Sequence, residues 1–396
     1  MRRVLLGAPP VLFALGAACA ATEGSGDPPP ASIIVPEAGA ETSAPDAGGV
    51  DGGCDASDES CVTKAISCAE AAFCPSDTGV SNLYALTAVW GSGPNDVWAA
   101  GSGGTIVHWD GSAWKPASPV PAVKNTFSHV IGTGPNDVWA ISATDTIFRS
   151  TGWNGGAATW TRMASPFADE YTLIPISAAW AHASGEMRLG GPSVYFDDGQ
   201  GNFAPHDQLV KTNVDGGVGW KPVTGTATIH AIWGASPDDV WIAGDNSQME
   251  KWQLGMTLHG TRPAGGKGDL TWVEVDSQAS VILTGIWGSS ASDVWAIGDK
   301  GTIRRFTAGA ERWEIVPSPT TEPLRAIWGA AANDVWAVGD NGTILHWDGT
   351  TWKPAVAAFP VNRKKPDLHG VWGAGPNDVW IVGATLALHF TGANKP

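Results

Sequence analysis

The clearest pattern in the chain is an alternation between short apolar runs and short polar turns, which is most regular over residues 324–354. Turns rich in Asn, Asp and Gly, such as Asp348-Gly349, separate the runs. Short runs with this punctuation are typical of β-strands joined by tight turns. The stretch therefore predicts one repeat unit of four strands, at Leu324–Trp328, Val335–Val338, Thr343–Trp347 and Thr351–Pro354.

Variants of this unit recur from Leu86 onward, each marked by Asn-Asp-Val-Trp or a close variant. The landmark tryptophans are Trp98, Trp139, Trp241, Trp295, Trp336 and Trp380. The wide interval between Trp139 and Trp241 contains a degenerate copy, in which Trp180 is followed by Arg188 at the landmark position. The sequence therefore predicts seven units.

Repeats of this kind fit a β-propeller, in which each small sheet packs against two neighbours. The run Val335–Val338 is apolar at every position, as expected for a strand that is covered on both faces. A β-solenoid would need shorter and more even coils. We therefore expect an all-β, seven-bladed propeller of four-stranded blades over residues 68–396.

The last unit lacks a fourth strand, because the chain has no tryptophan-bearing run after Leu386–Phe390. Counting back from Trp90 by the usual spacing reaches residues 70–77. There Phe73-Cys74-Pro75-Ser76 is similar to the fourth-strand run Trp114-Lys115-Pro116-Ala117. We expect this N-terminal strand to complete the last unit and close the ring.

The first residues read as an export signal. Met1-Arg2-Arg3 precedes the short apolar run Val4–Leu15 and small residues up to Ala18, which predicts a signal peptide at 1–18. Leu15-Gly16-Ala17-Ala18-Cys19 resembles a bacterial lipobox, with Leu15 four residues before Cys19 rather than the usual three. The resemblance implies lipidation of Cys19 and, because Ala20 follows, an outer-membrane anchor with the head facing the periplasm or cell surface. Ordinary cleavage after Ala18-Cys19-Ala20 is the alternative, and would give a fully secreted protein.

Residues 19–67 are acidic, rich in Pro, Gly, Ala and Asp, and predict a disordered tether. Four cysteines lie in and just after it, at Cys54, Cys61, Cys68 and Cys74. An even set in an exported chain predicts two disulfides, of which three connectivities are possible. No Cys-x-x-Cys pair or nearby histidine supports a metal site, so we expect none.

The net charge of −16 argues against nucleic acid as a partner, because an acidic surface repels phosphate. Motifs of hydrolases, zinc proteases and phosphate loops are absent from the sequence, so we expect neither catalytic residues nor a cofactor.

Two sets of polar residues recur once per unit. The histidines His108, His346 and His389 share a third-strand position, to which we assign Arg149, Phe196, Lys251 and Arg305 in other units. Asp96, Asp137, Asp239, Asp293, Asp334 and Asp378 share a turn position. Residues repeated around a ring do not converge on one reacting atom. We expect them to cap turns and to hydrogen-bond within each unit, and most tryptophans to pack between units.

The stretch Asn333–Trp352 resembles the bacterial propeller repeats grouped with BNR/Asp-box and photosystem II assembly factor-like proteins. The resemblance extends over most of residues 71–396. It implies the propeller fold, but such propellers serve as enzymes, lectins and scaffolds alike.

A unique recognition surface is expected where the repeats are interrupted. Two insertions, Asp197–Gly219 and Gln253–Leu270, are interpreted as long turns between third and fourth strands on one side of the ring. Together they predict a patch of ligand-binding candidates: His206, Asp207, Lys211, His259, Arg262 and Lys267.

We expect a monomeric, non-enzymatic binding or scaffold module for an envelope or extracellular protein. The alternative is a lectin that binds glycan or lipopolysaccharide, since the Trp-Gly pattern resembles tectonin-type propellers. A glycoside-processing enzyme is a weaker alternative, because a sialidase-like site needs tyrosine and the chain has only Tyr84, Tyr171 and Tyr195.

Overall fold

A computed structural model of the chain shows an all-β protein. The structure describes Asp58 and residues 60–119, 123–144, 146–164, 175–197, 203–214, 217–246, 255–263, 266, 268–384 and 386–396. The predicted signal peptide, Cys19, Cys54 and the tether up to residue 57 lie outside the described residues, so those assignments stay predictions. Two short 3-10 turns, η1 (Ser102–Gly104) and η2 (Asp299–Gly301), accompany the strands.

The strands follow the repeat units, and we number the units in chain order. They are β1 (Phe73–Ser76), β2 (Leu86–Gly93), β3 (Asp96–Gly101), β4 (Ile106–Trp109), β5 (Trp114–Pro116), β6 (Phe127–Gly134), β7 (Asp137–Ser142), β8 (Ile147–Asn154), β9 (Ala157–Arg162), β10 (Ala178–Ala181), β11 (Met187–Asp197), β12 (Phe203–Val214), β13 (Gly217–Thr224), β14 (Thr228–Ser236), β15 (Asp239–Asp245), β16 (Gly255–Thr261), β17 (Thr271–Glu274), β18 (Leu283–Ser290), β19 (Asp293–Gly298), β20 (Thr302–Thr307), β21 (Glu314–Val316), β22 (Leu324–Ala331), β23 (Asp334–Gly339), β24 (Ile344–Trp347), β25 (Trp352–Pro354), β26 (Leu368–Gly375), β27 (Asp378–Gly383) and β28 (Ala387–Phe390).

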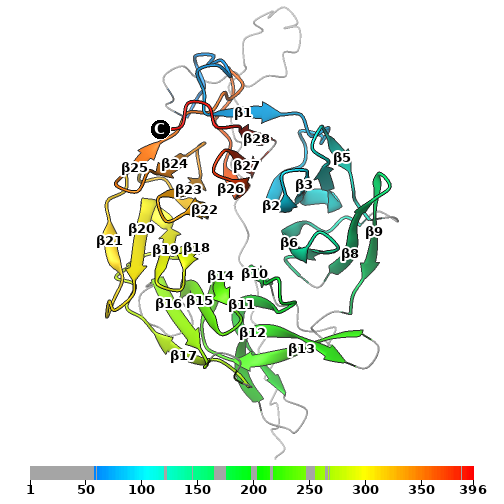
Figure 1. Ribbon diagram of the computed structural model, residues 1–396, viewed down its shortest axis with the longest axis vertical. Helices are drawn as coiled ribbons and strands as arrows, with labels where there is room; N and C mark the ends of the chain where they lie inside the picture. The colour runs from blue at the N-terminus through cyan, green and yellow to red at the C-terminus, as the bar shows by residue number, and fades with distance from the viewer. Residues whose placement is uncertain are drawn as a thin grey trace, which may run out of the picture. The chain divides into compact units, whose positions relative to one another are not determined.

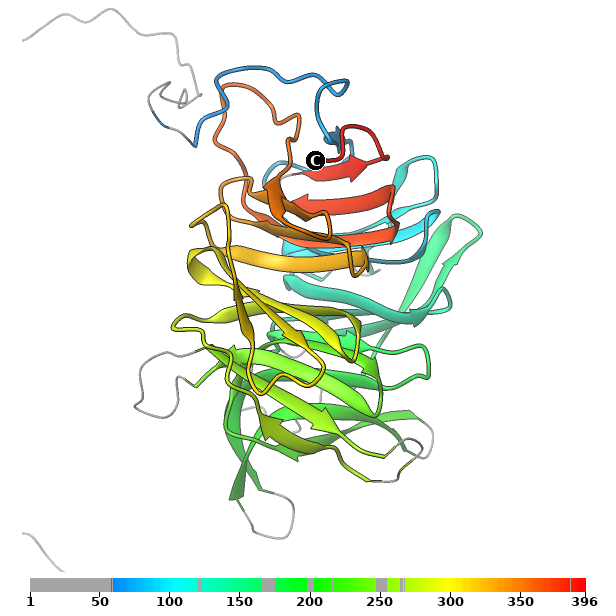
Figure 2. The same ribbon diagram turned by 60° about the vertical axis from the view of Figure 1, so that its left-hand side comes forward.

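Within a unit the strands pair antiparallel in chain order, as in the sheet β2-β3-β4-β5. The sheets lie around a common centre, with the first strand of each unit innermost (Figure 1). Seen from the side, successive sheets stack face to face (Figure 2). This arrangement of four-stranded antiparallel sheets confirms the predicted all-β, propeller-like fold.

The third and fourth units share one eight-stranded sheet, in which β11 meets β14 at the pair Pro192–Thr228. The predicted number of seven blades therefore stays a prediction. In the same region the expected strand positions were wrong. The segments Asp197–Gly219 and Gln253–Leu270 are not turns between third and fourth strands, since they contain all of β12 and all of β16.

The error has a structural cause, because many of the extra residues of these units come before the third strand. In the third unit, β11 continues to Asp197 past a register shift between Gly190 and Val194. The residue opposite Arg188 is therefore Val210 rather than Phe196. In the fourth unit, the residue opposite Trp241 is His259 rather than Lys251.

The N-terminal strand joins the last unit. Strand β1 pairs antiparallel with β28, in the sheet order β1-β28-β27-β26 and with Phe73 opposite Phe390. Phe73 is fully buried, and its ring meets Trp336 of the sixth unit edge-on at 5.1 Å. The predicted fourth-strand role of Phe73 agrees with this pairing.

Landmark tryptophans hold neighbouring units together. Each meets a fourth-strand ring of the following unit nearly at a right angle, a favoured aromatic geometry. The pairs are Trp98–Trp160, Trp139–Trp220, Trp241–Trp313, Trp295–Trp352, Trp336–Phe73 and Trp380–Trp114. In the third unit Arg188 replaces the tryptophan and lies over Trp272 at 5.9 Å. The tryptophans therefore pack between units, as predicted.

The Trp-Gly pairs of the first strands form a second contact between units. A Cβ atom added to Gly329 would lie 2.5 Å from the indole of Trp287 in the preceding unit. The same contact joins Trp90 to Gly132, Trp180 to Gly234, Trp233 to Gly288, Trp328 to Gly373 and Trp372 to Gly91. Where the second unit has Ile131 instead of tryptophan, the third has Ala181 instead of glycine, and both belong to one apolar cluster. The side chain of Ile131, which is smaller than tryptophan, therefore leaves room for the Cβ atom of Ala181.

The segment before β1 is fastened to the ring. Cys68 and Cys74 form a disulfide, and Cys61 is also disulfide-bonded. The amide of Val62 donates to the carbonyl of Arg363 at 3.0 Å. Asn394 donates to the carbonyls of Ala69 and Ala71. Residues 60–76, which we call the N-terminal clasp, thus contact both the loop after β25 and the last residues of the chain.

Candidate functional site

The repeated polar residues form internal pairs in every unit except the third. His108 Nε2 lies 2.7 Å from Asp96 Oδ1, and Arg149 Nε lies 2.7 Å from Asp137 Oδ1. The same pair recurs as His259–Asp239, Arg305–Asp293, His346–Asp334 and His389–Asp378. These side chains therefore hydrogen-bond within their own units, as predicted.

The predicted ligand-binding patch is not formed as one surface. His206 and Asp207 are buried, with 7% and 4% of their surface exposed. Asp207 accepts a hydrogen bond from the amide of Ala227 at 3.0 Å. It thereby fixes the backbone between β13 and β14, where the chain passes from the third unit to the fourth. Burial raises the pKa of this carboxyl, against hydrogen bonds that lower it. A buried group that fixes a backbone turn is a structural residue.

The other predicted residues lie apart from these two. Lys211 Nζ lies 5.5 Å from the ring centre of Trp139. His259 stacks flat on Trp241, so it belongs to the repeated pairs and not to an insertion. Arg262 donates to Asp238, to the carbonyl of Gly268 and to Glu186 of the third unit. Lys267 lies outside the described residues.

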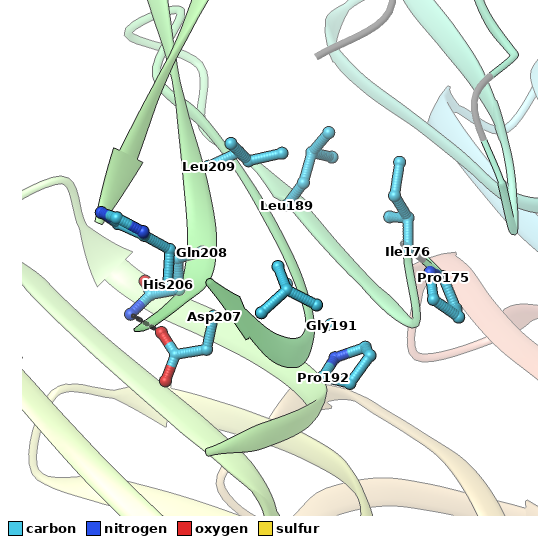
Figure 3. A pocket seen from close by; sticks show the side chains of 11 residues that line it. Pro175, Ile176, Leu189, Gly191, Pro192, His206, Asp207, Gln208 and Leu209 are labelled. Carbon is cyan, nitrogen blue, oxygen red and sulfur yellow. Dashed lines mark hydrogen bonds between the residues drawn. The ribbon is translucent and has the colours of Figure 1, made fainter. Parts of the chain in front are cut away.

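A pocket beside His206 and Asp207 is too small for a ligand. Figure 3 shows Leu189, Leu209, Ile176 and Pro192 around it, with the amide of Gln208 turned toward Asp207. Its cavity volume of about 20 Å³ is enough for a single water-sized group.

A larger cavity lies where the innermost strands face one another. This central channel has a volume of about 330 Å³ and is lined by every unit, from Thr87–Val89 on β2 to His369–Val371 on β26. One position of its wall is polar in each unit and differs between units. In chain order this position holds Thr87, Ser128, Ser177, His230, Thr284, Arg325 and His369. The channel is therefore a place where the repeats depart from symmetry.

Hydroxyls at this position join neighbouring units. Thr87 donates to the carbonyl of Phe127, Ser177 to that of Ile229, and Thr284 to that of Leu324. Each of these hydroxyls donates to the first strand of the next unit, so these positions stabilise the contact between units. They leave ligand recognition to the ionisable positions.

The ionisable positions occupy the fourth, sixth and seventh units. His230 Nε2 lies 2.7 Å from Asp245 Oδ2. Arg325 donates two hydrogen bonds to Asp340, at 2.8 and 2.6 Å, which raise the pKa of its guanidinium. It also contacts Asp299 at 3.4 Å. His230, Arg325 and His369 thus make this position ionisable in three units of the channel wall, whereas the other four units have a hydroxyl there.

His369 has no hydrogen bond among the described residues, although it lines the channel. Burial lowers the pKa of its ring, against the opposite effect of Asp367 and Asp340. Desolvation favours the neutral form, so at neutral pH the imidazole can both donate and accept. His369 is thus a polar group in the channel that is available to a ligand.

A further histidine, His129, lines the second unit's part of the channel. Ser128 Oγ lies 2.9 Å from its Nδ1. Burial lowers the pKa of His129 to about 4, although a hydrogen bond with the backbone of Ser177 acts in the opposite direction. No group of three or more His, Cys, Asp or Glu among the described residues is placed to hold a metal ion.

The channel residues were not predicted from the sequence. The available signal was a polar residue directly after the first apolar residue of each unit, as in Leu324-Arg325 and Leu368-His369. This signal is weak in the sequence, because the residue type at this position changes from unit to unit.

Comparisons with known proteins agree on the architecture. No family model and no curated protein matches the chain. Solved structures do match. The fold is that of a β-propeller. YCF48 bound to D1 peptide is 15% identical over 85% of this chain and 99% of that chain, with a TM-score of 0.58. Virginiamycin B lyase from Staphylococcus aureus is 16% identical over 81% and 98%, with a TM-score of 0.57.

A third match is Sqt1 from Chaetomium thermophilum bound to the N-terminus of ribosomal protein L10. It is 12% identical over 82% of this chain and 100% of that chain, with a TM-score of 0.51. At these identities the likeness concerns the fold alone, and the matches include both peptide-binding proteins and a lyase.

Proposed function

We propose that this chain is a non-enzymatic binding module, built as seven blades closed by β1, that takes a segment of a partner protein at the central channel. The observation that carries the proposal is the set of ionisable residues His230, Arg325 and His369 in an otherwise repeated wall. Recognition needs groups that differ from blade to blade, and the channel provides them on rigid strands.

The size and lining of the channel favour an extended protein segment. A volume of about 330 Å³ suits a few residues of a chain rather than a folded surface. Small and aliphatic residues such as Ala88, Ala231 and Ile327 line the rest of the wall, next to the polar positions. An apolar wall with a few polar groups matches a peptide, which presents both kinds of group. Two of the matched propellers were solved with peptide or protein termini bound, which supports the same ligand class.

Photo-crosslinking from the channel tests this proposal. A benzophenone amino acid at position 369 should crosslink one partner segment, identifiable by mass spectrometry. The same group at Ile315, which is 57% exposed on the outer strand β21, is the control. Equal labelling from both positions, or none from position 369, would contradict the proposal. Binding to a glycan array would favour the lectin instead.

We also propose that the module works in the cell envelope, anchored through Cys19. The support is the sequence of the export signal and the lipobox resemblance at Leu15–Cys19. Fatty-acid labelling in the native host should depend on Cys19 and disappear in Cys19→Ser. Unchanged labelling and membrane fractionation in Cys19→Ser would show that Cys19 is not the anchor.

A further inference from the structure

The repeated aspartates differ in what contacts their second carboxylate oxygen. Oxygen Oδ1 faces the histidine or arginine of the third strand in each pair. In the first, second and fifth units, a hydroxyl four residues earlier donates to Oδ2. The donors are Ser92 to Asp96 at 2.5 Å, Thr133 to Asp137 at 2.6 Å and Ser289 to Asp293 at 2.7 Å. In these units both oxygens are used internally.

The sixth unit lacks the hydroxyl, because Ala330 stands four residues before Asp334. There Lys395 Nζ takes its place, 2.6 Å from Asp334 Oδ2. The ammonium also donates to the carbonyl of Pro376 and lies 6.0 Å from the ring centre of Trp336. Only 10% of the Asp334 side chain is exposed. The contact of Lys395 thus shows that Oδ2 of the repeated aspartate can accept a hydrogen bond from a lysine ammonium when the hydroxyl is absent.

The seventh unit also lacks the hydroxyl, because Ala374 stands four residues before Asp378. His389 Nε2 lies 2.7 Å from Asp378 Oδ1, and its ring stacks on Trp380 at 3.9 Å. Asp378 Oδ2 has no hydrogen bond within the described residues. The side chains of Asp378 and His389 are 26% and 24% exposed, so the oxygen is accessible to a partner.

We propose that Asp378 is a docking point for a lysine ammonium of a partner protein, which binds Oδ2 as Lys395 binds Asp334. A carboxylate oxygen that lacks a donor suits a primary ammonium, as the contact of Lys395 with Asp334 shows. The fourth unit has a similar aspartate, Asp239, but Arg262 already binds the adjacent Asp238 and would repel a second cation. The site lies at the start of the second strand and does not depend on the channel proposal.

A titration of the full chain with Nα-acetyl-lysine methylamide tests the site, with the histidine rings labelled for NMR. We expect a saturable shift of His389 that weakens about tenfold in Asp378→Asn, the loss of one charge-assisted hydrogen bond. Ala374→Ser should weaken it as well, because the new hydroxyl can cap Oδ2 as Ser92 does. Ala374→Gly is the matched control and should keep the response.

The sixth unit gives an independent test. His346 should not respond in the wild-type protein, whereas Lys395→Met should open Asp334 and make it respond. The Nε-acetylated ligand, which lacks the ammonium, should move neither histidine. The proposal is overturned if His389 does not respond, if it responds equally to the acetylated ligand, or if Asp378→Asn leaves the affinity unchanged. A silent His346 in folded Lys395→Met would also overturn it.

Discussion

At the scale of single residues, the contact between a tryptophan and the glycine of the next unit explains why the Trp-Gly pair recurs. The indole occupies the space that a side chain at the glycine position would need. The glycine is thus required by packing rather than by backbone conformation, since the φ angle at Gly329 is not positive. The tryptophan of one unit and the glycine of the next act as one feature.

This contact predicts a compensating pair of substitutions. Gly329→Ala should lower the free energy of unfolding by about 1–3 kcal/mol, because its Cβ atom would lie 2.5 Å from Trp287. Adding Trp287→Ile should recover part of the loss, as Ile131 and Ala181 coexist elsewhere in the ring. Denaturant unfolding of the two single variants and the double variant gives the coupling energy.

The control for this cycle is Gly375→Ala, because nothing lies within 4 Å of a Cβ atom at Gly375. It should change the unfolding free energy little. Strict additivity of Gly329→Ala and Trp287→Ile would contradict the proposed contact.

His129 predicts a pH dependence of stability. The pKa of its ring falls from 6.5 to about 4 on folding, so the unfolded chain takes up a proton first as the pH is lowered. The stabilisation is complete above pH 6.5 and is lost as the pH falls toward 4. We expect a loss of about 2 kcal/mol over this range, less than full burial would give because the ring lines the channel.

Chemical denaturation of the full chain at several pH values measures this effect. His129→Gln cannot titrate, so its unfolding free energy should vary less with pH than that of the wild type. Parallel pH profiles for the two proteins would assign the dependence to other groups.

At the scale of elements, the last unit depends on a strand from the other end of the chain. Strand β1 has only four residues, but its Phe73 fills the place that a fourth-strand ring fills in the other units. The disulfide Cys68–Cys74 limits the freedom of the clasp in the unfolded chain, which favours the docked state.

Phe73→Ala should therefore lower the free energy of unfolding by about 3–5 kcal/mol, as for other large buried aromatic side chains. Leu83→Ala is a suitable control nearby, since Leu83 is 84% exposed. Thermal unfolding measures both. A melting temperature for Phe73→Ala equal to that of Leu83→Ala would show that β1 does not hold the last unit.

The elements also show what the sequence could and could not predict. The landmark at Trp336 and its relatives located most strands, because apolar runs between turn residues are local signals. Arg188 was recognised as a landmark position, and its contact with Trp272 accounts for the substitution. The third strands of the third and fourth units were misplaced because a longer β11 and an added segment before β16 leave no local mark of where the pairing resumes.

The candidate site was harder to predict than the fold. The channel brings together residues far apart in the sequence, such as His230 and His369, and only the arrangement of the sheets around a common centre (Figure 1) places them in the wall of one cavity. The sequence predicts His206 and Asp207 to lie in a long turn, whereas they belong to β12, and its pairing with β11 accompanies their burial.

At the scale of the whole molecule, each unit contacts its two neighbours, and the contact between Phe73 and Phe390 joins the N-terminal strand to the last one. A closed series of such contacts should unfold in one step, because opening any junction exposes two faces. Weakening one junction should turn the ring into a linear array.

We therefore expect tryptophan fluorescence and far-ultraviolet circular dichroism to report the same unfolding transition in the wild type. In Phe73→Ala the two transitions should separate, because units near the opened junction lose structure first. Leu83→Ala should keep them coincident. Coincident transitions in both variants would mean that closure does not set the cooperativity.

The match between Ile131 and Ala181 bears on how such a chain can change over generations. If the units descend from copies of one ancestral repeat, the second and third copies have since diverged together at their shared boundary. A unit from elsewhere in the ring, placed third, would bring glycine opposite Ile131 and leave a gap. A tryptophan-bearing unit placed second would collide with Ala181. The repeats have therefore lost their interchangeability, and recombination between them would be selected against at this junction first.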